Sequence, residues 1–165
     1  MYGNIGFLDN NNCDFKKYYK GKGLDKMMNW QHKVQYYETD QMQIVHHSNY
    51  IRWFEEARTY LMDEMVFSYF QMEEEGIVVP VLSAYAEYKS MVRFGETVEI
   101  EAKITEFTGV KLIIRYEVRD VETKEIRSIG ETKHAFLDKE TYRPISLKRK
   151  HKHIFELFNR MMEEK

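Results

Sequence analysis

The sequence predicts an α+β domain in which one long helix lies on an antiparallel sheet. Two patterns predict this arrangement. After residue 48, apolar residues recur at helical spacing over about four turns. From residue 77 onward they alternate with polar residues, which is typical of strands that bury one face. Turn-forming residues divide the alternating part into consecutive strands, and a helix followed by such a run favours the α+β class.

Length and composition limit the class of protein and the partners that we expect. At 165 residues, with 43% hydrophobic and 32% charged residues, the chain is long enough for one domain with a real core. A net charge of -2 argues against a nucleic-acid partner. The sequence has no run of roughly 18 apolar residues, so we expect no membrane span. The single cysteine, Cys13, cannot form an internal disulfide, which fits a cytoplasmic location.

Residues 1–29 are expected to form a poorly ordered extension, because they are polar, partly glycine-rich and without a regular period. The stretch Lys20-Gly21-Lys22-Gly23 requires purine-rich codons shortly before Met27 and Met28. A ribosome-binding site read in frame would look like this. We therefore also consider Met27 or Met28 as the native start.

The elements follow in order along the chain. Residues 32–37 are a short strand candidate, and Ser48 and Asn49 are good N-cap residues for the long helix. A second, shorter helix is expected over residues 67–75, with Gly76 as its stop. The apolar stripe of the long helix consists of Tyr50, Phe54, Ala57, Leu61 and Met65.

Four strands are expected to follow the helices, each pairing with the next, because sequential strands usually neighbour each other. Residues 97–107 alternate most clearly. The predicted strands are residues 77–89, 97–107, a third beginning after the turn at Thr108-Gly109, and 125–137. A C-terminal helix is expected over residues 148–160.

One acidic residue, Asp40, lies in the polar loop that leads into the long helix. Backbone N–H groups at the first turn of a helix have no partners within the helix and carry its positive dipole end. A carboxylate beside such donors suits hydrolysis of a thioester, which needs a nucleophile or base and donors for the developing oxyanion. From spacing alone, Asp40 also fits a simple turn residue.

The segment Tyr37-Glu38-Thr39-Asp40 through His46-His47-Ser48-Asn49-Tyr50 resembles the signature of the 4-hydroxybenzoyl-CoA thioesterase family. It is most similar to the branch associated with the Tol–Pal system. The resemblance covers residues 30–145. It implies a hotdog fold, a long central helix wrapped by a curved antiparallel sheet, over residues 30–147. The C-terminal helix expected above would then follow in residues 148–165.

The resemblance also implies an acyl-CoA thioesterase that releases a free acid and CoA. Asp40 would be the nucleophile or general base, and the amides of Ser48, Asn49 and Tyr50 would hold the oxyanion. His47 matches a histidine that often follows the loop with the catalytic Asp, so it contacts the substrate carbonyl, positions Asp40 or is an exposed loop residue. Coenzyme A is part of the substrate, and we expect no cofactor and no metal.

A second stretch, Tyr88-Lys89-Ser90-Met91-Val92-Arg93-Phe94-Gly95-Glu96, resembles a strand-end motif of the family. Lys89 and Arg93 are either cations that meet the CoA phosphates or charges at the rim. Two residues depart from the family pattern. Met91 replaces a proline, and Gln43 replaces a glycine three positions after Asp40.

Other residues are expected to be structural. Glu55, Glu56, Arg52 and Arg58 would form a solvated face of the helix, although Arg58 matches a family arginine that ties the helix to the sheet or a partner subunit. Ile113 and Ile129 would need cover, which predicts a homodimer or homotetramer. Two alternatives stay open: an acyl-ACP thioesterase and a non-catalytic acyl-CoA binder.

Overall fold

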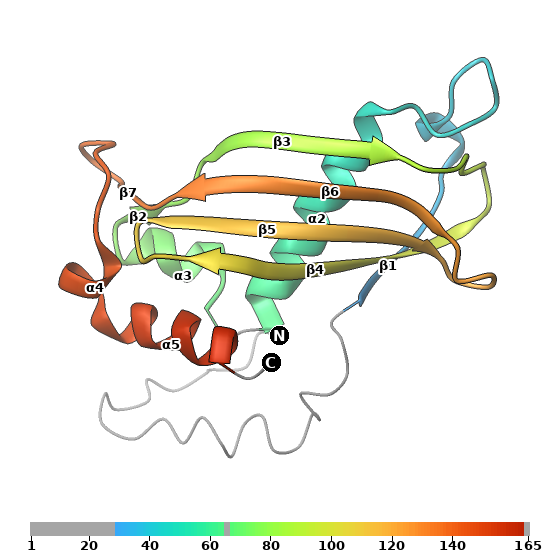
Figure 1. The fold of residues 1–165 in the computed structure, drawn as a ribbon. Coiled ribbons are helices and arrows are strands. Elements are labelled where there is room, and N and C mark those ends of the chain that lie inside the picture. The colour runs from blue at the N-terminus through green and yellow to red at the C-terminus, as the bar shows by residue number, and fades with distance from the viewer. Residues whose placement is uncertain (1–28, 65–66, 164–165) are drawn as a thin grey trace, which may run out of the picture.

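A five-stranded antiparallel sheet and the long helix behind it form the centre of the molecule (Figure 1). The computed structural model describes residues 29–64 and 67–163. The expectations for residues 1–28, including the alternative start, lie outside the described residues. The strands are β1 (Asn29–Lys33), β2 (Ile77–Val78), β3 (Val81–Tyr88), β4 (Thr97–Phe107), β5 (Lys111–Asp120), β6 (Ile126–Ala135) and β7 (Leu137–Asp138). The helices are α2 (Ser48–Glu64), α3 (Tyr69–Glu74), α4 (Leu147–Lys150), α5 (Lys152–Glu163) and a short 3₁₀ helix, η1 (Tyr36–Glu38).

The order of the strands differs from the predicted meander. The sheet runs β1-β4-β5-β6-β3, so β3 pairs with β6 and does not touch β4. Its register places Ala84 opposite Thr132 and Tyr88 opposite Ser128. Pairing β3 with β4, the next strand in sequence, was therefore wrong. Between these two strands the chain crosses the positions of β6 and β5, and β3 is left as an edge strand.

The first strand begins and ends earlier than predicted. β1 spans Asn29–Lys33 and pairs with β4, so residue 29 belongs to the sheet and not to the extension. After Val34 the backbone turns into η1, where the Glu38 carboxylate accepts the backbone N–H of Gln35 at 2.7 Å. That hydrogen bond closes a turn in place of continued strand pairing. The predicted strand over residues 32–37 is corrected accordingly.

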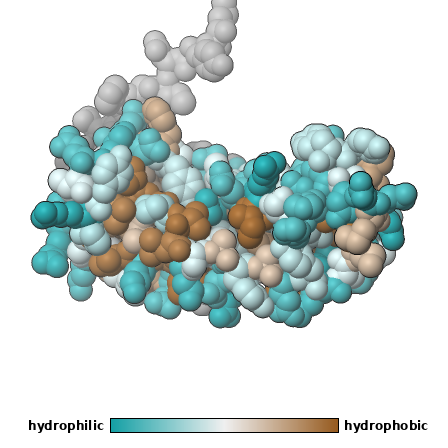
Figure 2. All heavy atoms as spheres, turned by 90° about the horizontal axis from the view of Figure 1, so that it is seen from above, coloured by the Kyte–Doolittle hydropathy of each residue, from teal (hydrophilic) through white to brown (hydrophobic). Residues whose placement is uncertain are grey.

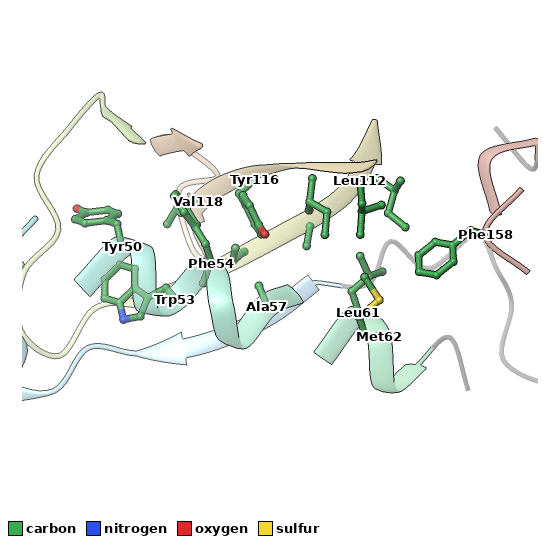
Figure 3. Close-up of a cluster of buried hydrophobic side chains, with 14 of the residues drawn as sticks. Tyr50, Trp53, Phe54, Ala57, Leu61, Met62, Leu112, Tyr116, Val118 and Phe158 are labelled. Carbon is green, nitrogen blue, oxygen red and sulfur yellow. The ribbon is translucent and has the colours of Figure 1, made fainter. Parts of the chain in front are cut away.

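The core lies between α2 and the inner face of the sheet. The predicted stripe is confirmed where it is described: Tyr50, Phe54, Ala57 and Leu61 are all buried. They face residues of β5, including Leu112, Tyr116 and Val118 (Figure 3). The Phe54 ring stacks on Tyr116 with centroids 4.5 Å apart. Helix α5 adds Ile154 and Phe158, both fully buried, at the other end of this core.

Three predicted elements are divided in the structure. Residues 77–89 form two strands, β2 and β3, because Pro80 lies between them and cannot donate to a ladder. Residues 125–137 likewise form β6 and the start of β7, and β7 pairs with β2. The C-terminal helix breaks at His151 into α4 and α5.

Arg58 has the structural role implied by the family resemblance and does not belong to a solvated helix face. Its side chain is only 7% exposed, whereas Arg52, Glu55 and Glu56 are exposed. The guanidinium lies 5.7 Å from the centroid of the Tyr69 ring. Burial acts to lower the pKa of Arg58, but the nearby phenols of Tyr69 and Tyr116 together outweigh it and leave the pKa above its ordinary value. The buried charge therefore joins α2 to α3 and β5, which is a structural role.

Candidate active site

A groove at the beginning of α2 contains the predicted carboxylate. Its volume is about 340 Å³, within the usual range for small-ligand sites of about 300–1,000 Å³. One side comes from the loop before α2 and the first turn of that helix, and the other from the end of β3 and the segment after it. The lining residues are Asp40, Met42, Ile44, Val45, His47, Tyr50, Tyr88, Lys89, Ser90, Met91 and Val92.

Asp40 starts a tight loop, residues 40–44, which we call the Asp loop. The backbone N–H of Asp40 donates to Ile44 O at 2.9 Å, and that of Gln43 donates to Asp40 O at 2.9 Å. One carboxylate oxygen, Oδ1, accepts the N–H of Met42 at 2.8 Å. The side chain of Asp40 is therefore oriented from within the loop that carries it.

Gln43 is the residue that gives the Asp loop its shape. Its φ is +60°, in the left-handed region that glycine adopts at low cost. The glycine of the family pattern is replaced here, yet the backbone keeps a conformation that suits glycine. The Gln43 side chain is exposed and does not line the groove. The substitution therefore strains the loop and does not fill the site.

We predict that Gln43→Gly raises the free energy of unfolding by up to about 1 kcal/mol. A non-glycine residue in this region costs roughly 1–2 kcal/mol, from which the greater freedom of glycine in the unfolded chain is subtracted. Urea titration measures the change. Gln41→Gly is the matched control, because Gln41 is exposed and does not have a positive φ. The control should lose stability, and a gain in both variants would contradict the explanation.

The amides at the start of α2 are partly engaged within the turn. The N–H of Asn49 donates to His46 O at 3.0 Å. Those of Ser48 and Tyr50 make only long contacts, at 3.4 Å to His46 Nδ1 and at 3.4 Å to His47 O. The N–H of His47 has no acceptor among the described residues. The freest donors are therefore those of His47, Ser48 and Tyr50.

Arg127 holds the opposite wall of the groove. Its guanidinium donates to Ser90 Oγ at 3.3 Å and to Met91 O at 3.2 Å. The same group binds Asp120 Oδ2 at 3.0 Å. The backbone N–H of Val45 then joins the two walls by donating to Val92 O at 2.8 Å. Both sides of the groove are thus connected to the sheet and to each other.

The structure brings together four of the seven predicted site residues. Asp40, His47, Tyr50 and Lys89 line the groove. Lys89 also pairs with Glu87, so its charge is partly compensated.

The other three do not line it. Asn49 is buried, and its side chain donates to Glu38 O at 2.8 Å. Ser48 is bound through its Oγ to His46 Nδ1 at 2.9 Å. Arg93 is exposed beside Met91, with 3.9 Å from its Nη2 to the sulfur. Of these three, only Ser48 keeps a backbone N–H free enough for the predicted oxyanion role, because the N–H of Asn49 already donates to His46 O.

Several lining residues were not predicted as site residues. Met91 was noted only as a departure from the family pattern, and Met42, Ile44 and Val92 were not singled out. Tyr88 closes the groove beside the helix: its hydroxyl donates to His47 O at 3.2 Å, and its ring lies 4.9 Å from that of Tyr50. Their common signal was proximity in sequence to the two family motifs.

Tyr50 cannot serve as the base in this groove. Burial raises the pKa of its phenol to about 12, and the neighbouring Tyr88 adds to the shift. The phenol therefore stays neutral near pH 7. Within the described residues, no group of three or more His, Cys, Asp or Glu side chains could hold a metal ion. Asp40 is the lining carboxylate, a group that can attack a carbonyl carbon or activate water.

Solved structures define the class of this fold. The DHNA-CoA thioesterase of Staphylococcus aureus aligns with a TM-score of 0.77 at 28% identity, covering 82% of this chain and 90% of that chain. A hypothetical protein of Aquifex aeolicus aligns with a TM-score of 0.71 at 31% identity, covering 78% of this chain and 97% of its own. These alignments confirm the predicted hotdog fold. Together with the groove at the start of α2, they place the chain in the thioesterase class.

Sequence comparison identifies the family. The model of the thioesterase-like superfamily matches residues 34–155, and the chain belongs to this family. The YneP protein of Bacillus subtilis, whose name gives acyl-CoA thioesterase as its expected activity, is 34% identical over 71% of this chain and 84% of its own length. The acyl-CoA thioester hydrolase YbgC of Escherichia coli is 27% identical over 58% of this chain and 72% of its own. The narrower Tol–Pal branch stays a prediction.

Proposed function

We propose that this protein is an acyl-CoA thioesterase, which hydrolyses an acyl-CoA to a carboxylic acid and CoA. The observation that carries the proposal is the position of Asp40. Its carboxylate lines a groove at the start of α2, beside backbone donors of the first turn, in a chain of the thioesterase-like superfamily. A nucleophile or base opposite preorganised donors is what acyl transfer requires.

Two routes use the same groove. In one, Asp40 takes a proton from water, the hydroxide adds to the thioester carbon, and CoA leaves as the thiolate and is protonated. In the other, an Asp40 oxygen attacks the carbon, CoA leaves, and water hydrolyses the resulting anhydride. In both, the carbonyl oxygen becomes negative, and the N–H groups of His47, Ser48 and Tyr50 are the proposed donors to it.

The test is a thiol-release assay on acyl-CoAs that differ in chain length and aromaticity. Each acyl group is offered on CoA and on acyl carrier protein. We expect release of free thiol from CoA esters. Turnover only on the carrier would instead support an acyl-ACP thioesterase. Binding of acyl-CoA without thiol release would support a non-catalytic binder and would overturn the proposal.

We further propose that two copies associate through β3. Within residues 29–64 and 67–163 this strand has one edge paired with β6 and the other unpaired, and an open edge readily pairs with another strand. Its exposed apolar residues include Val81, 46% exposed, and Leu82, 58% exposed. Viewed from the β3 side, hydrophobic side chains gather mainly in the half nearer the start of this strand (Figure 2). Antiparallel pairing of the two edges gives a twofold dimer.

Leu82→Lys should convert the dimer to a monomer, because the substitution places a charge on the proposed pairing edge. Light scattering coupled to size exclusion measures the mass. Ile113→Lys is the control, because Ile113 lies on the outer face of the sheet, where it is partly covered by its neighbours. If only the control dissociates, then the outer face and not β3 is the interface.

The remaining expectations stay predictions: no cofactor, a cytoplasmic location, and a homodimer or homotetramer. No helix of the described residues is long and apolar enough to cross a membrane. Lys89, at the rim of the groove, is proposed as a contact for the CoA phosphates, where an ammonium acts as a point charge.

A further inference from the structure

Glu38, two residues before Asp40, is a buried carboxylate outside the groove. Its side chain is about as inaccessible as the apolar core, with 4% of the residue exposed. A carboxylate in such a place is costly unless its oxygens are hydrogen-bonded. Its contacts therefore need an explanation beyond the turn in which it lies.

Both carboxylate oxygens of Glu38 accept donors from separate elements. Oε1 accepts Trp53 Nε1–H of α2 at 2.8 Å. Oε2 accepts the Gln35 N–H at 2.7 Å and lies 2.7 Å from His32 Nε2 of β1. Burial raises the pKa of Glu38, but these hydrogen bonds outweigh burial and leave it below its ordinary value. The group is thus ionised at neutral pH and joins β1, η1 and α2.

The backbone of Glu38 holds the far side of the Asp loop. Glu38 O accepts the N–H of His46 at 2.8 Å and Asn49 Nδ2–H at 2.8 Å. Glu38 therefore connects the segment before the Asp loop to two others. These are the segment after the loop, at His46, and the first turn of α2, at Asn49. In contrast, among the described residues the Asp40 carboxylate is bound only within its own loop, where it accepts the N–H of Met42.

We propose that Glu38 is a positioning residue for Asp40, which sets the carboxylate at the correct distance from the donors at the start of α2. The proposal rests on the thioesterase function proposed above. It follows from geometry: the loop with Asp40 and the helix with the donors are separate elements, and Glu38 binds both. Displacements of about 1 Å in such a site can cost on the order of 100-fold in rate.

Glu38→Gln tests the proposal without changing the size of the side chain. The glutamine amide has one acceptor oxygen and one NH₂ group. At one of the two former carboxylate oxygen positions, the NH₂ group would face an N–H donor and a hydrogen bond would be lost. We expect kcat to fall about 10- to 100-fold with KM changed less than about threefold, since position matters most in the transition state. In the Asp40→Asn background, Glu38→Gln should cause almost no further loss, because residues that act as a unit are not additive.

A second readout does not depend on activity. Hydrogen exchange of the amides of residues 40–46 should speed up at least about tenfold in Glu38→Gln, because the loop opens locally. Exchange in β4 and β5 should not change. Asp138→Asn is the matched control: Asp138 Oδ1 accepts the N–H groups of Glu140 and Thr141 in a turn at the opposite end of the sheet (Figure 1). It should alter neither kcat nor exchange in the Asp loop.

The outcomes separate the two proposals. If the wild-type protein releases no thiol, then the thioesterase function fails, and the exchange measurement alone decides whether Glu38 holds the Asp loop. If the wild-type protein is active and Glu38→Gln keeps its kcat and its exchange pattern, then only the role of Glu38 is overturned. Losses from Glu38→Gln and Asp40→Asn that simply add would also overturn it, since they would indicate independent effects.

Discussion

Asp40→Asn is expected to lower kcat/KM on the preferred acyl-CoA by about 100- to 10,000-fold, the usual contribution of a positioned base or nucleophile. The asparagine amide keeps the size of the side chain and can still accept the N–H of Met42 through its oxygen. It cannot take a proton from water or form an anhydride. The loop is therefore preserved while the chemistry is lost, and thiol release measures the loss.

Asp63→Asn provides the control for this substitution. Asp63 lies on the exposed face of α2, one carboxylate among the acidic residues of the same helix, and does not line the groove. We expect it to leave the rate unchanged. The KM of Asp40→Asn should stay close to that of the wild-type protein, because the groove is intact. Full activity of Asp40→Asn would contradict its assignment as nucleophile or base.

The elements with a strong period were predictable from the sequence. The strand predicted over residues 97–107 is β4, Thr97–Phe107, because Val98, Ile100, Ala102 and Ile104 alternate with polar residues and all four are buried. The helix predicted after residue 48 is α2 for the same reason, with its apolar stripe against the sheet. In both, the local pattern and the burial in the fold agree.

The order of the strands could not be predicted in this way. β3 has the composition of a strand, yet no feature of residues 81–88 states which neighbour it pairs with. The partner, β6, follows β4 and β5 in the chain, so that Val81 pairs with His134 and Tyr88 with Ser128. The rule that sequential strands pair is a tendency, and here a crossover overrides it. The edge position of β3 then explains why most of this strand is exposed, whereas the alternating strands β4 and β5 bury one face.

The predicted residues of the candidate site came mainly from the family resemblance, which directed attention to Asp40 and His47. The residues that support them were harder to predict. Glu38 was only part of the quoted motif, because its role depends on His32 and Trp53, which lie six and fifteen residues away in the sequence. Trp53 is also a core residue by its pattern, so nothing in the sequence indicates that its indole N–H serves a carboxylate. Hydrogen bonds between elements have no period that a sequence pattern reveals.

Gly130 marks the place where α2 lies closest to the sheet. A Cβ at this position would be 2.3 Å from Phe54 Cε2, 2.4 Å from Phe54 Cζ and 3.0 Å from Tyr85 O. The Phe54 ring is fully buried and stacked on Tyr116, so it has no free space into which to move. Glycine is required here by close approach and not by backbone conformation, since Gly130 does not have a positive φ.

Gly130→Ala should therefore lower the free energy of unfolding by about 3 kcal/mol, at the upper end of the usual cost of overpacking. The midpoint temperature of thermal unfolding should fall by about 6–12 °C for a domain of this size. Adding Phe54→Leu should recover part of the loss, because leucine removes the ring atoms that the new methyl group meets.

Gly95→Ala is the control: Gly95 has a φ of +83° and nothing within 4 Å of the added carbon. Its cost is backbone strain alone, about 1 kcal/mol. Equal losses in the two alanine variants, or no recovery with Phe54→Leu, would show that contact with Phe54 does not determine the glycine at this position.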